Sequence, residues 1–90
     1  MSSVVVRTFV VRNPQGLHLR PAELLSKACQ RFGAKIEIVK NHERVDAKSI
    51  FAIVTLVALE GTELTFEADG PDANDALDAV AELFAGNFGE

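Results

Sequence analysis

The chain has 90 residues, of which 48% are hydrophobic and 24% charged, and it contains one cysteine. This length predicts one domain over residues 1–90 with a single core. Charged residues interrupt every apolar stretch before it reaches about 18 residues, which excludes a membrane-spanning segment. The N-terminus lacks the basic and apolar regions of a secretory signal, and Cys29 alone cannot form an internal disulfide. We therefore expect a cytoplasmic location.

The charges are distributed unevenly along the chain. Residues 1–50 carry nine basic and four acidic side chains, whereas residues 51–90 carry nine acidic and no basic ones. Nine basic residues spread over fifty positions form no dense patch, so nucleic acid is not expected as a partner.

The first third of the chain predicts a strand followed by a helix. The valine-rich segment 4–11 is typical of a strand buried largely on both faces. Residues 13–16, Asn-Pro-Gln-Gly, are typical of a turn. Apolar residues then recur at helical spacing from Pro21, and Gly33 stands where a helix is expected to end.

The middle of the chain predicts two strands and a short helix. Residues 35–40 alternate charged and apolar side chains, which predicts a half-buried strand, and 44–46 predict the return strand of a hairpin. Ser49 is a favourable N-cap for an apolar stripe over residues 50–57, a helix that we expect to stop by Gly61. The many β-branched residues in this stripe leave a strand as the alternative.

The last third predicts a strand and the most clearly amphipathic helix of the chain. Residues 63–67 alternate again, and the helical stripe runs over 73–84 with Asp72 or Asn74 as its cap. Gly86 is expected to end this helix. The order β-α-β-β-α-β-α predicts an α+β open-faced β-sandwich, a four-stranded sheet with three helices on one face.

The segment Gly16–Ala22, GLHLRPA, carries the residues best suited to chemistry. It places the imidazole of His18 at a helix N-terminus, beside backbone N–H groups that can bind an anion. Arg20 adds a guanidinium suited to phosphate oxygens. A nucleophilic nitrogen, an anion cradle and an arginine together indicate a phosphohistidine site. The residues alone also fit a histidine that only caps the helix.

GLHLRPA resembles the active-site signature of the HPr family, the histidine-containing phosphocarriers of the bacterial phosphotransferase system. A second block, residues 47–50 with Leu56 after it, resembles the family's regulatory serine region, and residues 68–77 resemble the entry to its last helix. The resemblance extends from about Val6 to Phe84. Leu19 departs from it, because many members carry a smaller or polar residue after the histidine.

This resemblance implies a phosphoryl carrier, not a stand-alone enzyme. His18 would accept a phosphoryl group on Nδ1 from phosphorylated enzyme I and pass it to an enzyme IIA-type acceptor. Arg20 and the backbone N–H of Leu19 would stabilise the phosphate. The resemblance implies no cofactor and no metal at the carrier, no membrane insertion, and a monomer.

Further site residues are expected around His18. Ser49 would be a regulatory phosphorylation site for an HPr kinase/phosphorylase in addition to its role as a cap. The expected partner-binding residues are Gly16, Leu17, Lys27, Lys48, Ile50, Phe51 and Val54, with Phe51 the most exposed of the apolar ones. Arg20, Lys27, Arg31 and Lys48 would form a basic rim around His18 that suits acidic partners.

Two alternatives remain at this point. The C-terminal residues resemble those of nitrogen-type regulatory paralogues, which are not coupled to sugar uptake. An interaction module without phosphotransfer is the alternative from a different class. His42 is expected to be solvated and Cys29 to pack as a small hydrophobe. The spacing of Asp72, Asp75 and Asp78 favours helix-dipole stabilisation over a metal site.

Overall fold

The computed structural model describes residues 4–90, and its elements follow the predicted order. The strands are β1 (Val4–Val10), β2 (Lys35–Lys40), β3 (Glu43–Asp46) and β4 (Glu63–Asp69). The helices are α1 (Leu19–Gln30), α2 (Ile50–Thr55) and α3 (Ala73–Ala85), followed by a 3₁₀ turn, η1 (Asn87–Gly89). The helical interpretation of residues 50–55 is therefore confirmed over the strand alternative.

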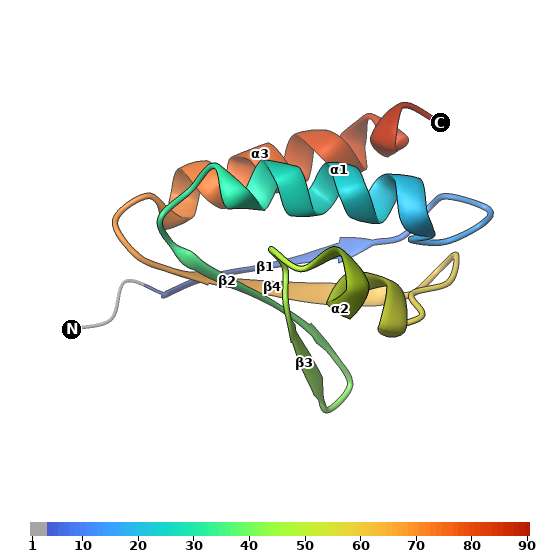
Figure 1. Cartoon of the computed structure of the whole chain (residues 1–90), viewed down its shortest axis with the longest axis horizontal. Helices are drawn as coiled ribbons and strands as arrows, with labels where there is room; N and C mark the ends of the chain where they lie inside the picture. The colour runs from blue at the N-terminus through green and yellow to red at the C-terminus, as the bar shows by residue number, and fades with distance from the viewer. Residues whose placement is uncertain (1–3) are drawn as a thin grey trace.

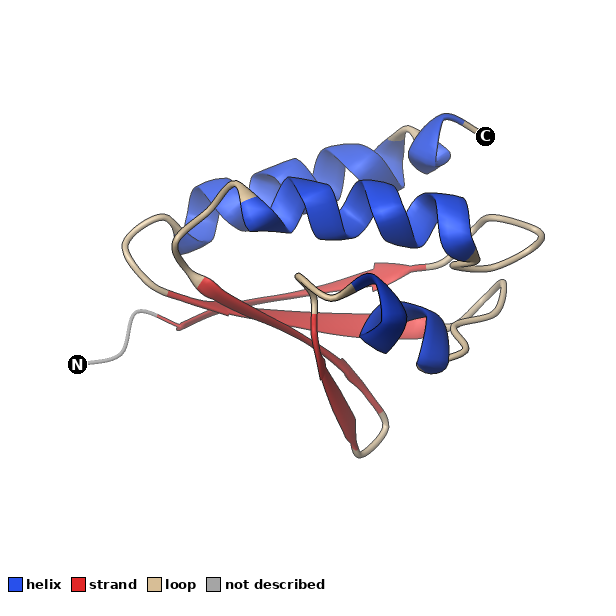
Figure 2. Cartoon of the chain, in the orientation of Figure 1, coloured by secondary structure: helices blue, strands red, loops and turns tan. Residues whose placement is uncertain are grey.

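The four strands form one antiparallel sheet in the order β1-β4-β2-β3, with the helices on one face (Figure 1). Figure 2 shows α1 and α3 side by side over this face, and α2 packs beside α1 near β3. The predicted open-faced β-sandwich is thus confirmed. None of the helices in residues 4–90 is long and apolar enough to cross a membrane.

The core lies between the sheet and the two long helices. Alternate residues of β2 and β4 face it, as their sequence pattern predicts: Ile36, Ile38, Leu64, Phe66 and Ala68. Cys29 on α1 is also buried there, and burial raises the pKa of its thiol to about 12. The opposite face of the sheet carries polar contacts, among them the Thr8–Thr65 hydroxyl pair and the ion pairs of Arg44 with Glu37 and Glu67.

The prediction that the first strand is buried on both faces is wrong. β1 forms an edge of the sheet and pairs only with β4. Its residues alternate between exposed and half-buried, so Val4, Val6 and Val10 point to solvent. A run of valines satisfies strand propensity at an exposed position as well as at a buried one, and composition could not separate the two.

Two predicted helix ends also differ from the structure. α1 begins at Leu19, two residues before Pro21, and ends at Gln30 with Arg31 as its C-cap, so Gly33 lies in the following loop. Asp72 occupies the N-cap position of α3, but its side chain makes no capping bond to that helix.

The carboxylate of Asp72 instead joins α3 to the loop between α1 and β2. It accepts the N–H groups of Gly33 and Ala34, both at 2.8 Å. The hydrogen bond from Gly33, and then that from Ala34, hold the pKa of Asp72 below its usual range, against the opposite effect of desolvation. The N-cap carboxylate of α3 therefore fixes the loop that leads into β2.

We predict that Asp72→Ala lowers the thermal unfolding midpoint at pH 7, because the loop loses both acceptor contacts. A depressed folded-state pKa means that this stabilisation is present above the unfolded value, about 3.9, and is lost as the pH falls through the folded one. Thermal unfolding followed by circular dichroism should show the difference from the parent shrinking in acid. Asp75→Ala, which removes an exposed carboxylate from the same helical turn, is the control. Equal midpoints for Asp72→Ala and the parent at pH 7 would contradict the prediction.

Candidate functional site

The loop from β1 to α1 is held against the segment that follows α2. The N–H of Leu17 donates to the carbonyl of Ala58 at 2.9 Å, and Gly16 has φ +71°. A Cβ at Gly16 would overlap the Ala58 carbonyl oxygen, so this position requires glycine for both space and conformation. The contact fixes the backbone immediately before His18.

His18 enters α1 as its N-cap residue through the backbone alone. Its φ of −74° and ψ of −170° are extended, and its carbonyl accepts the N–H of Ala22 at 3.0 Å. The imidazole makes no capping hydrogen bond, so the side chain has no capping role. The N–H groups of the first turn, including those of Leu19 and Arg20, have no carbonyl partner within the helix and can bind an anion.

The imidazole is instead bound by the last residue of the chain. Nε2 of His18 lies 2.9 Å from Oε2 of Glu90, and the side chains keep 35% and 23% of their exposure. Asn13, which is 1% exposed, donates Nδ2 to Oε1 of Glu90 at 2.7 Å and to the Asn87 carbonyl at 3.3 Å. The β1–α1 loop and the C-terminal turn thus meet at the histidine.

These contacts stabilise the ionised form of Glu90. The hydrogen bond from Asn13 is the largest cause that lowers its pKa, and the hydrogen bond from His18 and the charge of Arg20 act in the same direction. Desolvation opposes them without reversing the shift. The carboxylate beside His18 is therefore charged over the neutral pH range.

Exposed apolar side chains surround the histidine. Val54, Val57 and Leu59 line a shallow hollow together with Gln15 and His18. Other exposed large apolar residues are Leu19, the first residue of α1, and Phe51 near the start of α2. Phe51 is 80% exposed, as predicted, whereas Ile50 is half-buried and packs against the core.

The expected basic rim around His18 is not formed. Lys48 donates its ammonium to the Phe32 carbonyl at 2.7 Å, and its own carbonyl accepts from Gln30, the last residue of α1. It therefore lies at the far end of α1, about 18 Å of helix from His18.

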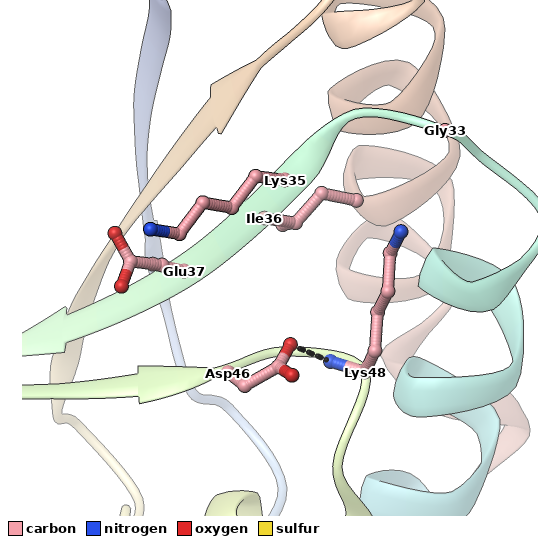
Figure 3. A pocket seen from close by; sticks show the side chains of 6 residues that line it. All are labelled: Gly33, Lys35, Ile36, Glu37, Asp46 and Lys48. Carbon is pink, nitrogen blue, oxygen red and sulfur yellow. Dashed lines mark hydrogen bonds between the residues drawn. The ribbon is translucent and has the colours of Figure 1, made fainter.

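Figure 3 shows the Lys48 side chain directed toward the loop that carries Gly33, with its backbone N–H bound to Asp46. Arg31 follows α1 at this same end. Of the four residues expected in the rim, Arg20 lies beside His18, whereas Lys27 stands in the last turn of α1 and pairs with Glu23 at 3.2 Å. The predicted basic rim is wrong because residues on or beside one helix can be separated by the full length of that helix.

Ser49 caps α2, as predicted. Its Oγ accepts the N–H of Ala52 at 3.3 Å, and its backbone is extended. Because α2 begins beside the C-terminal end of α1, Ser49 and His18 lie at opposite ends of that helix. The two residues do not form one site.

The turn after α2 contains a β-branched residue in a left-handed conformation. Val57 has φ +52° and is 58% exposed. Nζ of Lys40 donates to the carbonyls of Leu56 at 3.1 Å and Val57 at 3.3 Å, which braces this turn from β2. Ala58, whose carbonyl binds Leu17, follows directly, so the strained turn positions the backbone that supports His18.

Sequence reasoning missed the contributions of Asn13, Val57, Leu59 and Glu90. Its sequence context predicts only a turn for Asn13, and no sequence pattern points to Glu90. No local pattern signals a contact between residues 72 positions apart, such as that of His18 and Glu90. In residues 4–90 no three His, Cys, Asp or Glu side chains lie close enough to hold a metal ion.

An open-faced sandwich that presents a histidine at the entry of its first helix defines the class of this protein. The family model described as PTS HPr component phosphorylation site matches residues 5–86. Phosphocarrier protein HPr of Treponema pallidum is 42% identical over 87 residues, which is 97% of this chain and 99% of the relative. The chain therefore belongs to the HPr family, the phosphocarrier proteins of the phosphotransferase system, which are carriers and not catalytic enzymes.

Solved structures agree with this assignment. HPr-C-His from Thermoanaerobacter tengcongensis has a TM-score of 0.92 at 34% identity and covers 96% of this chain and 97% of its own. HPr from Bacillus anthracis has a TM-score of 0.85 at 36% identity, covering 91% and 98%. The relative and these two structures are all phosphocarrier proteins HPr, which does not favour the nitrogen-type paralogue.

We predict that Val57→Gly stabilises the protein by about 1 kcal/mol, because glycine adopts the left-handed conformation without the steric cost that a β-branched residue bears. Urea unfolding measures the change. Val54→Gly is the matched control: it replaces the same residue type inside α2 and should destabilise by about 1 kcal/mol or more. A destabilised Val57→Gly would show that the turn carries no strain.

Proposed function

We propose that His18 carries the phosphoryl group, accepting it from phosphorylated enzyme I and passing it to an enzyme IIA-type acceptor. One observation carries this proposal: the imidazole stands exposed at the N-terminus of α1 with Nε2 directed to Glu90. Since a carboxylate can only accept a hydrogen bond, Nε2 holds the proton and Nδ1 keeps the lone pair. Nδ1 is then the nucleophile.

The transfer step requires positioning and charge stabilisation. The Nδ1 lone pair attacks phosphorus in line with the bond that joins it to the donor, and this bond breaks as its electron pair returns to the donor atom. The guanidinium of Arg20 and the N–H groups of Leu19 and Arg20 stabilise the charge on the phosphoryl oxygens. The second transfer is the same step in reverse toward the acceptor.

The partners dock on the exposed apolar residues of α2 and of the start of α1. Phe51 and Val54 from α2 and Leu19 from α1 supply the apolar contact. Lys27 lies exposed in the last turn of α1, where it would contact the edge of a docked partner. Gly16 and Leu17 are buried, so we propose that they act by shaping the loop and not by touching the partner. One chain contains every element of this site, which supports transfer by a monomer, although an HPr dimer from T. tengcongensis is among the similar structures.

Related proteins support a phosphotransfer chain as the setting. A 39% identical relative is the phosphoryl donor subunit DhaM of PEP-dependent dihydroxyacetone kinase from Providencia stuartii, and another is the multiphosphoryl transfer protein of Haemophilus influenzae. This chain spans 17% and 18% of their lengths. We propose Ser49 as a second phosphorylation site, used by an HPr kinase/phosphorylase, because a phosphate there would lie at the start of α2.

We predict that incubation with phosphoenolpyruvate and enzyme I forms an acid-labile, alkali-stable phosphoprotein, and that His18→Ala forms none. Radiolabel retained on the protein measures this. Ser49→Ala should keep the label, because Ser49 lies at the opposite end of α1. An unlabelled parent protein, or full labelling of His18→Ala, would refute the assignment of His18.

We predict that Arg20→Glu slows labelling by at least about tenfold, because it replaces the guanidinium at the phosphate by a negative charge. The far-UV spectrum should not change, since Arg20 is exposed and an acidic residue suits the first helical turn. Arg31→Glu makes the same charge change at the other end of α1 and should leave the rate near that of the parent. Equal rates for the two variants would remove Arg20 from the mechanism.

A further inference from the structure

The C-terminal turn is anchored in the core and is not a loose end. Phe88 is buried, and its ring packs edge-on against Phe84 of α3 with 4.9 Å between centroids. Asn87 and Phe88 both have φ +54°, which turns the chain back toward the β1–α1 loop. The Asn13 side chain then binds the Asn87 carbonyl and the Glu90 carboxylate. The turn is thus held by the core through Phe88 and by the β1–α1 loop through Asn13.

This anchoring presents one charged group to one nitrogen of the histidine. Oε1 of Glu90 is occupied by Asn13 at 2.7 Å, which leaves Oε2 to bind Nε2 of His18 at 2.9 Å. The charged groups that face Glu90 are His18 and Arg20, and the latter favours the carboxylate from the first turn of α1. The buried amide of Asn13 fixes the carboxylate before any partner arrives.

We propose that Glu90 is a positioning residue for phosphotransfer: held by Asn13 and the Phe88 anchor, it keeps the proton on Nε2 of His18 in both the free and the phosphorylated ring. This inference rests on the proposed role of His18. It assigns a function to the C-terminal turn, and it concerns the chemistry of the ring and not partner recognition.

The proton on Nε2 matters most when the phosphoryl group leaves. With Nδ1 bonded to phosphorus and Nε2 protonated, cleavage of the N–P bond returns its electron pair to Nδ1 and releases a neutral imidazole. If Nε2 had lost its proton, the leaving group would be an imidazolate anion, which is far more basic. A carboxylate at Nε2 therefore extends to higher pH the range over which the carrier donates its phosphoryl group efficiently. It also balances the positive charge of the phosphorylated ring.

The test compares Glu90→Gln with the parent protein by two measurements. Gln retains an oxygen and the size of the side chain but removes the charge. In proton NMR of the unphosphorylated protein, the Nε2–H of His18, assigned by its absence in His18→Ala, should be visible in the parent and weakened or lost in Glu90→Gln. For the phosphorylated forms, the rate of transfer to an acceptor should decline at a pH roughly half a unit lower in Glu90→Gln.

Glu43→Gln, an exposed carboxylate at the β2–β3 turn, is the matched control and should behave as the parent in both measurements. Glu90→Asp retains the charge and should restore part of the parent pH profile. An unchanged Nε2–H signal together with an unchanged pH profile in Glu90→Gln would overturn the proposal. Should the parent take up no phosphoryl group, the proposed role of His18 fails, and the positioning contact is then supported or refuted by the Nε2–H signal alone.

Discussion

The geometry at the histidine depends on the packing of Phe84 with three other phenylalanine rings. Phe84 of α3 stacks on Phe9 of β1 at 4.9 Å and meets Phe66 of β4 and Phe88 of η1 edge-on. The contacts with Phe9 and Phe66 hold the end of α3 against the sheet, and the contact with Phe88 holds the turn that follows α3 in the core. The position of the C-terminal turn, and with it the carboxylate beside His18, follows from this aromatic cluster.

Three segments converge on the histidine, and each is fixed by a different interaction. Close approach of Gly16 to Ala58 fixes the loop before His18, and the hydrogen bonds from Lys40 fix the turn after α2. Asn13 fixes the side-chain carboxylate of Glu90. None of these contacts requires a bound partner. The site is thus preorganised by backbone and buried polar contacts, while the surface that we propose for partner docking is apolar and exposed.

The sequence was sufficient for the element order, the sheet alternation and the placement of His18, because these depend on local periodicity and on residues adjacent in the chain. Ser49 as a cap and Phe51 as an exposed ring could be predicted for the same reason. The roles of Lys48, Asp72 and Glu90 could not be predicted, because their partners are distant in the sequence. The partner of Lys48 lies 16 positions away, those of Asp72 lie 38 and 39 positions away, and that of Glu90 lies 72 positions away. Only tertiary packing determines such pairs. The exposure of one face of β1 could not be predicted, because it depends on the edge position of this strand in the order β1-β4-β2-β3.

The buried cysteine has a practical consequence for spectroscopy on this protein. Cys29 is the only cysteine of the chain, and a thiol with a pKa of about 12 stays protonated and unreactive at neutral pH. A second cysteine introduced on the open face of the sheet, for example at Thr8, would then be the sole reactive thiol. Fluorescent or spin labels can accordingly be attached at a chosen position without first replacing the native residue.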